Sequence, residues 1–170
     1  MRKAKVSPYY SEPLLFESDN VQWNTALALL KDLRLAEARS AFLAYRDVNR
    51  GCLDTAGYLA VLELIENGLA DLPEGKAGAL ALGRLARNLR ELIQGLGLEA
   101  EPVPSVLPRL LYERAAACLN LKELTSDPFL SDGTPAGLLY LQAGQADPAI
   151  AALQAALLKS KNNASIYGYL

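Results

Sequence analysis

Residues 137–157 read GLLYLQAGQADPAIAALQAAL, and this stretch constrains the fold of the chain more than any other. It contains two glycines seven positions apart, many alanines and one charged residue, Asp147. Such a composition is compatible with disorder, with a membrane helix, or with helices that approach each other closely. Gly144 and the Asp147-Pro148 pair interrupt the apolar run well before the roughly 18 residues that a membrane span requires. We therefore expect two short, closely packed helices.

The rest of the chain also predicts helices. Leu and Ala dominate the apolar residues, whereas the β-branched and aromatic residues that favour strands are sparse, so the expected class is all-α. Thr134 is a good N-cap with Pro135 at the first helical position, and Asp147 with Pro148 repeats the pattern. Together with five helices earlier in the chain, these two bring the predicted number to about seven. The five are expected over residues 19–33, 35–49, 55–68, 77–94 and 106–121, and a loop with a single helical turn follows the last of them.

The segment before the first predicted helix, residues 1–18, carries Tyr9, Tyr10 and Phe16 among prolines, and we expect it to be extended. We expect this strip to pack against its own domain, residues 19–170, rather than to serve as an exposed docking motif. It starts basic but lacks the apolar core and cleavage site of a secretory signal, which predicts a cytoplasmic protein. The net charge of −2 disfavours nucleic acid and an anionic membrane as partners.

The residue types needed for most catalytic and metal sites are scarce. Histidine is absent, which excludes Ser-His-Asp and Cys-His catalysis and removes the commonest zinc ligand. Cys52 and Cys118 lie far apart in the sequence, and we expect them to be buried free thiols. The carboxylates are scattered and predict surface solvation. We therefore expect a protein that is not an enzyme and that has neither a cofactor nor a metal ion.

Small and large residues recur in the last two predicted helices with a spacing that is typical of a known family. The positions are Gly137, Tyr140, Gly144, Ala149, Leu153 and Ala156. In this respect the segment over residues 134–170 resembles a tetratricopeptide repeat, whose paired helices place small residues where the other helix inserts a large one. The phase continues to Tyr167 and Leu170, and residues 19–49 fit less closely. The resemblance implies antiparallel helical hairpins stacked as a right-handed superhelix, irregular in the middle; the alternative is an irregular helical bundle.

The resemblance further implies a non-enzymatic scaffold that binds a protein or peptide on its concave face. The matching positions are Trp23, Leu27, Leu30, Lys31, Thr134, Leu138, Leu141 and Gln142. They are mostly apolar, which favours an apolar or helical partner segment. The alternative interpretation of this face is that neighbouring helices or the N-terminal strip fill it.

The end of the sequence, NNASIYGYL, predicts a new helix without a capping signal. We therefore expect the chain to be the N-terminal part of a longer repeat protein, with possible self-association through the uncapped end. The alternative function is a regulatory or substrate-docking domain of a larger enzyme, such as a transferase, whose catalytic part lies elsewhere.

Three arginines, Arg84, Arg87 and Arg90, recur every three residues along the fourth predicted helix. Such a stripe can hold an acidic peptide or a phosphate. The simpler interpretation, which we favour at this point, is a solvated helix face with an ion pair between Arg87 and Glu91 one turn later.

Overall fold

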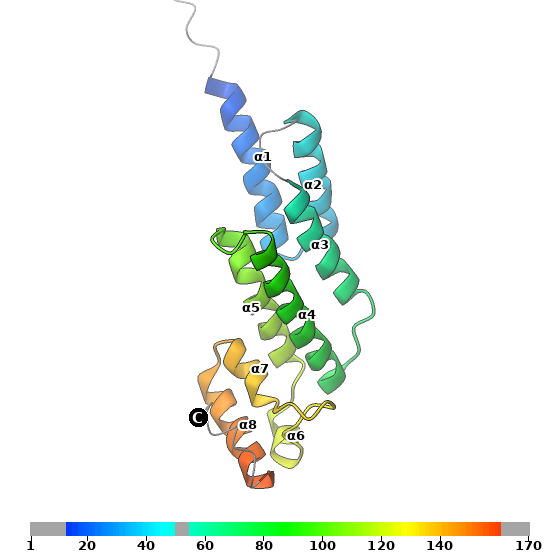
Figure 1. Cartoon of the computed structure of the whole chain (residues 1–170), viewed down its shortest axis with the longest axis vertical. Coiled ribbons are helices and arrows are strands. Elements are labelled where there is room, and N and C mark those ends of the chain that lie inside the picture. Colours follow the sequence, from blue (N-terminus) through cyan, green and yellow to red (C-terminus); the bar gives the residue numbers. More distant parts are fainter. Residues whose placement is uncertain (1–12, 50–54, 161–170) are drawn as a thin grey trace, which may run out of the picture. The chain divides into compact units, whose positions relative to one another are not determined.

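The computed structural model describes residues 13–49 and 55–160, with the backbone alone for residues 13–20. Within these residues the regular secondary structure is α-helical, and an isolated β-bridge joins Phe129 to Pro135, which confirms the predicted all-α class. The chain divides into two compact units, Met1–Leu62 and Glu63–Leu170, with the boundary inside α3 (Thr55–Leu69) (Figure 1). The single helical domain expected over residues 19–170 therefore contains a division that the sequence analysis did not place. None of the described helices has the length and apolarity needed to cross a membrane.

The first unit contains the helical hairpin of α1 (Pro13–Lys31) and α2 (Leu35–Val48). Between them Leu33 adopts the left-handed conformation, with φ at 56°, and the Arg34 N–H donates to the Leu29 carbonyl at 2.9 Å. This bond closes the end of α1 in the way that a C-terminal glycine usually does. The chain therefore turns at the position where the repeat template has glycine, although leucine stands there.

The start of α1 differs from the prediction. The helix begins at Pro13, so residues 13–18, which were expected to be extended, are helical, whereas Tyr9 and Tyr10 lie outside the described residues. Proline suits this position because its fixed φ matches the first helical turn, where its missing N–H has no intrahelical acceptor. The residues that follow, LLFES, include neither glycine nor a β-branched residue, so nothing in them opposes a helix.

The core of the first unit is built around aromatic rings. The Trp23 ring of α1 lies edge-on to Phe42 at 5.3 Å between centroids, and its distances to Tyr45 and Tyr58 are 5.1 and 4.9 Å. These are the separations that aromatic pairs prefer. Phe42 is completely buried, and Leu30 of the same face of α1 is too. The inward face of α1 is therefore committed to the core of its own unit.

In the part of the second unit that the structure describes, residues 63–160, the end of α3 is followed by five further helices. They are α4 (Gly75–Gly95), α5 (Pro102–Ala117), α6 (Leu121–Ser126), α7 (Gly137–Gln142) and α8 (Ala146–Lys159). α4 packs against α5, α5 against α7, and α8 against both α7 and α6 (Figure 1). The short α6 is the single turn predicted in the loop.

α5 begins four residues earlier than the prediction and ends at Ala117. Pro102 and Pro104 precede the predicted start at residue 106, but they occupy the first turn of α5, where proline costs no hydrogen bond. Pro108 lies inside the same helix and is buried, so its ring contributes to packing. The sequence GLGLEA alone ends α4, and the prolines after it belong to the next helix.

The α7–α8 hairpin has the close contact that its small residues predict. A Cβ atom at position 137 would lie 2.7 Å from the Leu153 Cγ and 3.0 Å from the Ala149 carbonyl oxygen, so only glycine fits at this crossing without a shift. Gly144 lies between the helices with φ at 77°, a conformation that favours glycine. Tyr140 and Leu153, the predicted large residues of the pattern, are both buried. Tyr167 and Leu170 lie outside the described residues.

The segment before α7 is a tight turn, where the sequence predicts a helix start. Thr134 is not an N-cap and Pro135 is not helical, because the Ala136 N–H donates to the Pro128 carbonyl and the Leu130 N–H to the Thr134 carbonyl. α7 therefore begins at Gly137 and is only six residues long. This turn, residues 127–135, forms one wall of the groove described next.

Candidate functional site

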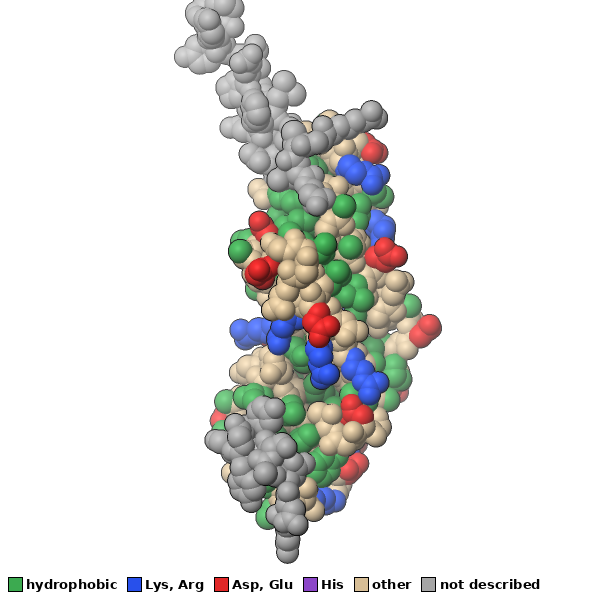
Figure 2. Space-filling model, in the orientation of Figure 1, with side chains coloured by type: hydrophobic (Ala, Val, Ile, Leu, Met, Phe, Trp, Pro, Cys, Tyr) green, Lys and Arg blue, Asp and Glu red, His purple; other side chains and the backbone are tan. Residues whose placement is uncertain are grey.

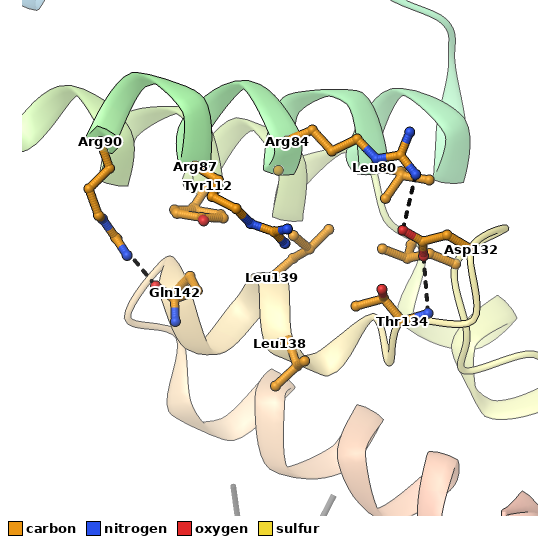
Figure 3. Close-up of a pocket in the computed structure, with 12 residues that line it drawn as sticks. Leu80, Arg84, Arg87, Arg90, Tyr112, Asp132, Thr134, Leu138, Leu139 and Gln142 are labelled. Carbon is orange, nitrogen blue, oxygen red and sulfur yellow. Dashed lines mark hydrogen bonds and ion pairs between the residues drawn. The ribbon is translucent and has the colours of Figure 1, made fainter. Parts of the chain in front are cut away.

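A groove of about 250 Å³ lies in the second unit, between α4, α7 and the turn that precedes α7 (Figure 3). We call it the arginine groove. Its lining residues are Leu80, Gly83, Arg84, Arg87, Arg90, Tyr112, Leu130, Asp132, Thr134, Leu138, Leu139 and Gln142. Pockets for drug-sized ligands and cofactors have volumes of roughly 300–1,000 Å³. The arginine groove is therefore suited to one or two side chains of a partner rather than to a cofactor.

The three arginines come from the outer face of α4. The opposite face of this helix is buried through Leu82, Leu85 and Leu89, so residues at the alternate positions point away from the core. The ion pair expected between Arg87 and Glu91 is not among those formed by the described residues. Figure 2 shows basic side chains gathered in a band across this face of the second unit. The arginine stripe is thus one wall of a groove, which the simpler interpretation did not anticipate.

Arg84 is held by an acidic residue of the turn. Its Nη2 lies 3.2 Å from the Asp132 Oδ2, and the Thr134 N–H donates to the Asp132 Oδ1 at 3.0 Å. Burial, the largest single influence, raises the pKa of the Asp132 carboxyl, but the hydrogen bonds from Thr134 and Arg84 together outweigh it and leave the pKa below its usual value. Asp132 is therefore a fixed anion that positions Arg84 and joins the turn to α4.

Arg90 is held at the other end of the row. Its Nη2 donates to the Gln142 Oε1 at 3.3 Å, and its guanidinium carbon lies 5.8 Å from the centroid of the Tyr112 ring. The second distance is within the roughly 6 Å over which a cation is attracted to an aromatic face. The side chain of Arg90 is thus oriented by α5 and α7 together.

Arg87, between the two, has a different environment. Among the described residues no acceptor forms a hydrogen bond or an ion pair with its guanidinium. Its side chain extends from α4 across the groove towards Leu139 of α7 (Figure 3). The row therefore contains two arginines that are engaged with the chain's own oxygen atoms and one that is not.

The walls between the charged groups are apolar. Leu130 and Leu139 are buried, whereas Leu80 and Leu138 are half-buried and present part of their surface to the groove. The Leu139 side chain of α7 packs on the backbone of α4 at Gly83, where a Cβ atom would lie 2.7 Å from the Leu139 Cδ2. The groove thus combines cationic groups with an apolar surface.

The eight residues predicted for a concave face are not equivalent in the structure. Thr134, Leu138 and Gln142 line the arginine groove, and Leu141 is 39% exposed but lies outside it. These four belong to the second unit.

The other four predicted residues belong to the first unit. Leu30 is a correction: it is completely buried and has no surface for a ligand, because its side chain completes the core of the first unit. Trp23 is half-buried with its ring engaged by three other rings. Leu27 is half-buried and Lys31 is exposed. At Trp23 and Leu30 the structure supports the alternative interpretation, in which neighbouring helices fill the predicted concave face.

Sequence reasoning missed the opposite side of the arginine row, above all Asp132 and Tyr112. The sequence did contain one signal, because Asp132 followed by Gly133 and Thr134 is typical of a turn in which an aspartate accepts the N–H two residues later. The partner of that aspartate lies 48 positions earlier, and no local pattern predicts such a contact. Tyr112 carried no signal of its own.

The described residues include no group of three or more histidine, cysteine, aspartate or glutamate residues that could hold a metal ion. Cys118 is a free thiol and is half-buried rather than buried as expected, whereas Cys52 lies outside the described residues. No family model, no curated protein and no solved structure matches the chain.

Proposed function

We propose that the protein is a non-enzymatic module that binds a protein or peptide segment, and that the segment enters the arginine groove. The observation that carries this proposal is the composition of the groove walls. Half-buried leucines and an arginine without a partner in the described chain lie together in a volume fit for one or two side chains. Interfaces between proteins are enriched in arginine and in tyrosine, and both line this groove.

The polar groups of the groove support binding more than catalysis. Asp132 is the carboxylate that lines it, and a carboxylate whose pKa lies below the usual value is a weak base. Its oxygen atoms are engaged by Arg84 and Thr134, so it is not poised to accept a proton from a substrate.

The α7–α8 hairpin supports a scaffold of the tetratricopeptide-repeat kind. A Cβ at Gly137 would contact Leu153, and Gly144 has the left-handed turn conformation, as the resemblance to this family leads one to expect. Three of the residues for which the resemblance implies ligand binding, Thr134, Leu138 and Gln142, line the groove. A helix of six residues is short for this role. We therefore base the binding function on the groove, and we propose the relationship to the tetratricopeptide-repeat family separately.

The test is affinity capture from an extract of cells that make the protein, with two tryptophan variants compared with the wild type. Gln142→Trp places a large ring in the groove, whereas Gln145→Trp places the same ring on an exposed position between α7 and α8 outside it. Far-UV circular dichroism checks that both variants remain helical. We expect Gln142→Trp to lose proteins that the wild type and Gln145→Trp both retain. Identical recovery with all three chains would contradict the proposed binding surface.

A further inference from the structure

We infer that the arginine groove recognises an acidic side chain of its partner, a glutamate or aspartate carboxylate flanked by apolar residues, and that Arg87 is the residue that binds it. This inference rests on the proposed function and adds the chemistry of the ligand. It follows from the arginine row and from what each of its members already contacts.

The chain itself shows what these arginines bind. Arg84, the first of the three, forms an ion pair with the carboxylate of Asp132, and Arg90, the third, donates a hydrogen bond to the amide oxygen of Gln142. Both partners are oxygen acceptors that come from the opposite wall of the groove. Arg87 lies between them and extends into the same space, without a hydrogen bond or ion pair to any described residue (Figure 3). If a ligand supplies an oxygen acceptor to Arg87, each arginine of the row bonds an oxygen acceptor.

The hydrogen-bond donors left unused in the row favour a carboxylate. Asp132 neutralises Arg84, and Arg90 is oriented by the neutral Gln142 amide and the Tyr112 ring, so Arg87 is the guanidinium of the row with its full hydrogen-bonding capacity. A single guanidinium matches a single carboxylate in a bidentate pair. The ligand's carboxylate is thus expected to pair with Arg87, and the charge of Arg90 nearby adds to the attraction.

A phosphate group suits this groove less well. Phosphate sites commonly add backbone N–H donors to their cations, but α4 contributes its arginines from the middle of a 21-residue helix whose N–H groups are used internally. A phosphorylated partner is therefore an outcome that the test must distinguish.

The apolar walls specify what flanks the acidic residue. Leu80, beside Arg84, and Leu138 present partly exposed surface to the groove (Figure 3), and the volume of about 250 Å³ has room for little more than the acidic side chain and one apolar neighbour. Burying such a neighbour removes apolar surface from water and excludes solvent from the ion pair, which strengthens it. The ligand class is therefore an acidic residue beside a leucine-like residue in an otherwise unspecified peptide.

The test uses the full ¹⁵N-labelled chain and three acetylated, amidated pentapeptides, Gly-Leu-Xaa-Leu-Gly, where Xaa is glutamate, glutamine or phosphoserine. Nuclear magnetic resonance follows the arginine Nε–H signals and the backbone amides of Gly83 and Leu139 during titration. We expect saturable shifts with the glutamate peptide. The dissociation constant of the glutamine peptide should be at least roughly tenfold higher, because hydrogen bonds to a charged group are lost.

Two variants complete the test. Arg87→Gln is expected to lower the affinity for the glutamate peptide to that of the glutamine peptide. Arg114→Gln removes the same charge from an exposed position of α5 outside the groove, and is expected to bind as the wild type does. Since Arg87 is exposed and forms no hydrogen bond or ion pair with a described residue, its replacement by glutamine should leave the helical content unchanged.

Each remaining outcome overturns the inference. If the glutamate and glutamine peptides bind equally well, or if Arg87→Gln binds the glutamate peptide as the wild type does, the inference that the ligand is a carboxylate is wrong. Shifts confined to α4 and α7 in such an experiment would still support the groove as a peptide-binding surface. If the phosphoserine peptide binds more than tenfold tighter than the glutamate peptide, the ligand class is a phosphopeptide. If no peptide gives saturable shifts at millimolar concentration, carboxylate recognition is refuted, and the capture experiment decides the proposed function independently.

Discussion

Replacing Gly137 by alanine is expected to destabilise the second unit, because the new methyl group has no room. The Cβ would lie 2.7 Å from the Leu153 Cγ and 3.0 Å from both the Ala149 oxygen and the Leu153 nitrogen. Leu153 is 1% exposed and cannot swing its side chain into solvent. The two other atoms belong to the backbone of α8, so relief of the clash requires α8 itself to move away from α7.

The magnitude follows from two opposing effects. Forcing an extra methyl group into a packed contact costs about 1–3 kcal/mol. Alanine favours a helix over glycine by about 0.5–1 kcal/mol, which offsets part of that cost. The net loss is therefore about 0.5–2 kcal/mol, equivalent to a roughly 2- to 30-fold shift towards the unfolded state.

The matched control for Gly137→Ala is Gly95→Ala. Gly95 is the last residue of α4, and a Cβ there would meet nothing within 4 Å. We expect this variant to be as stable as the wild type or slightly more stable, since only helix propensity changes. Urea unfolding followed by far-UV circular dichroism measures both variants. If Gly137→Ala is as stable as Gly95→Ala, the close crossing of α7 and α8 is refuted.

Three further predictions test other parts of the molecule. Folding lowers the pKa of Asp132 below 3.8, so its carboxylate contributes stability that is present above that pH and is lost as the pH falls through the folded pKa. The stability difference between the wild type and Asp132→Asn in urea unfolding should thus be full at pH 7 and should shrink as the pH falls below 3.8; a difference that does not change with pH would contradict the ionised contact. Phe42→Ala should cost about 3–5 kcal/mol in the first unit, measured by the fluorescence of Trp23, the chain's single tryptophan, and an unchanged midpoint would contradict the ring contact. Gly144→Ala should cost about 1–2 kcal/mol because φ is 77°, and a loss no larger than that of Gly95→Ala would show that the turn adjusts without strain.

The helices were predictable from the sequence because their signals are local. α2 and α3 lie within about a residue of the predicted ranges, since apolar periodicity and the residues that end a helix act over one or two turns. The contact of Gly137 with Leu153 was also predictable, because both residues belong to one hairpin with a short connection. For these elements the information needed lies within about 20 consecutive residues.

The turn before α7 could not be predicted in the same way. Thr134 and Pro135 form a good local signal for a helix start, and the signal failed because tertiary hydrogen bonds compete with it. Asp127 accepts from the Lys76 Nζ at 2.5 Å, and the same amine donates to the Phe129 carbonyl at 3.2 Å. Lys76 lies on α4, about 50 residues earlier, so its contribution to the stability of the turn cannot be predicted from residues 127–135 alone.

The same contacts explain why the arginine row of α4 forms a groove instead of a solvated face. Lys76 and Arg84 hold the turn through Asp127 and Asp132, and the turn in turn sets where α7 begins. Had the helix started at Pro135, the Asp132 carboxylate would not be held in the bend that places it opposite Arg84. Two basic side chains of α4 thus position the opposite wall through contacts within the chain itself. Because the chain's own contacts hold this wall, a partner that binds Arg87 needs to spend less of its binding energy on ordering side chains.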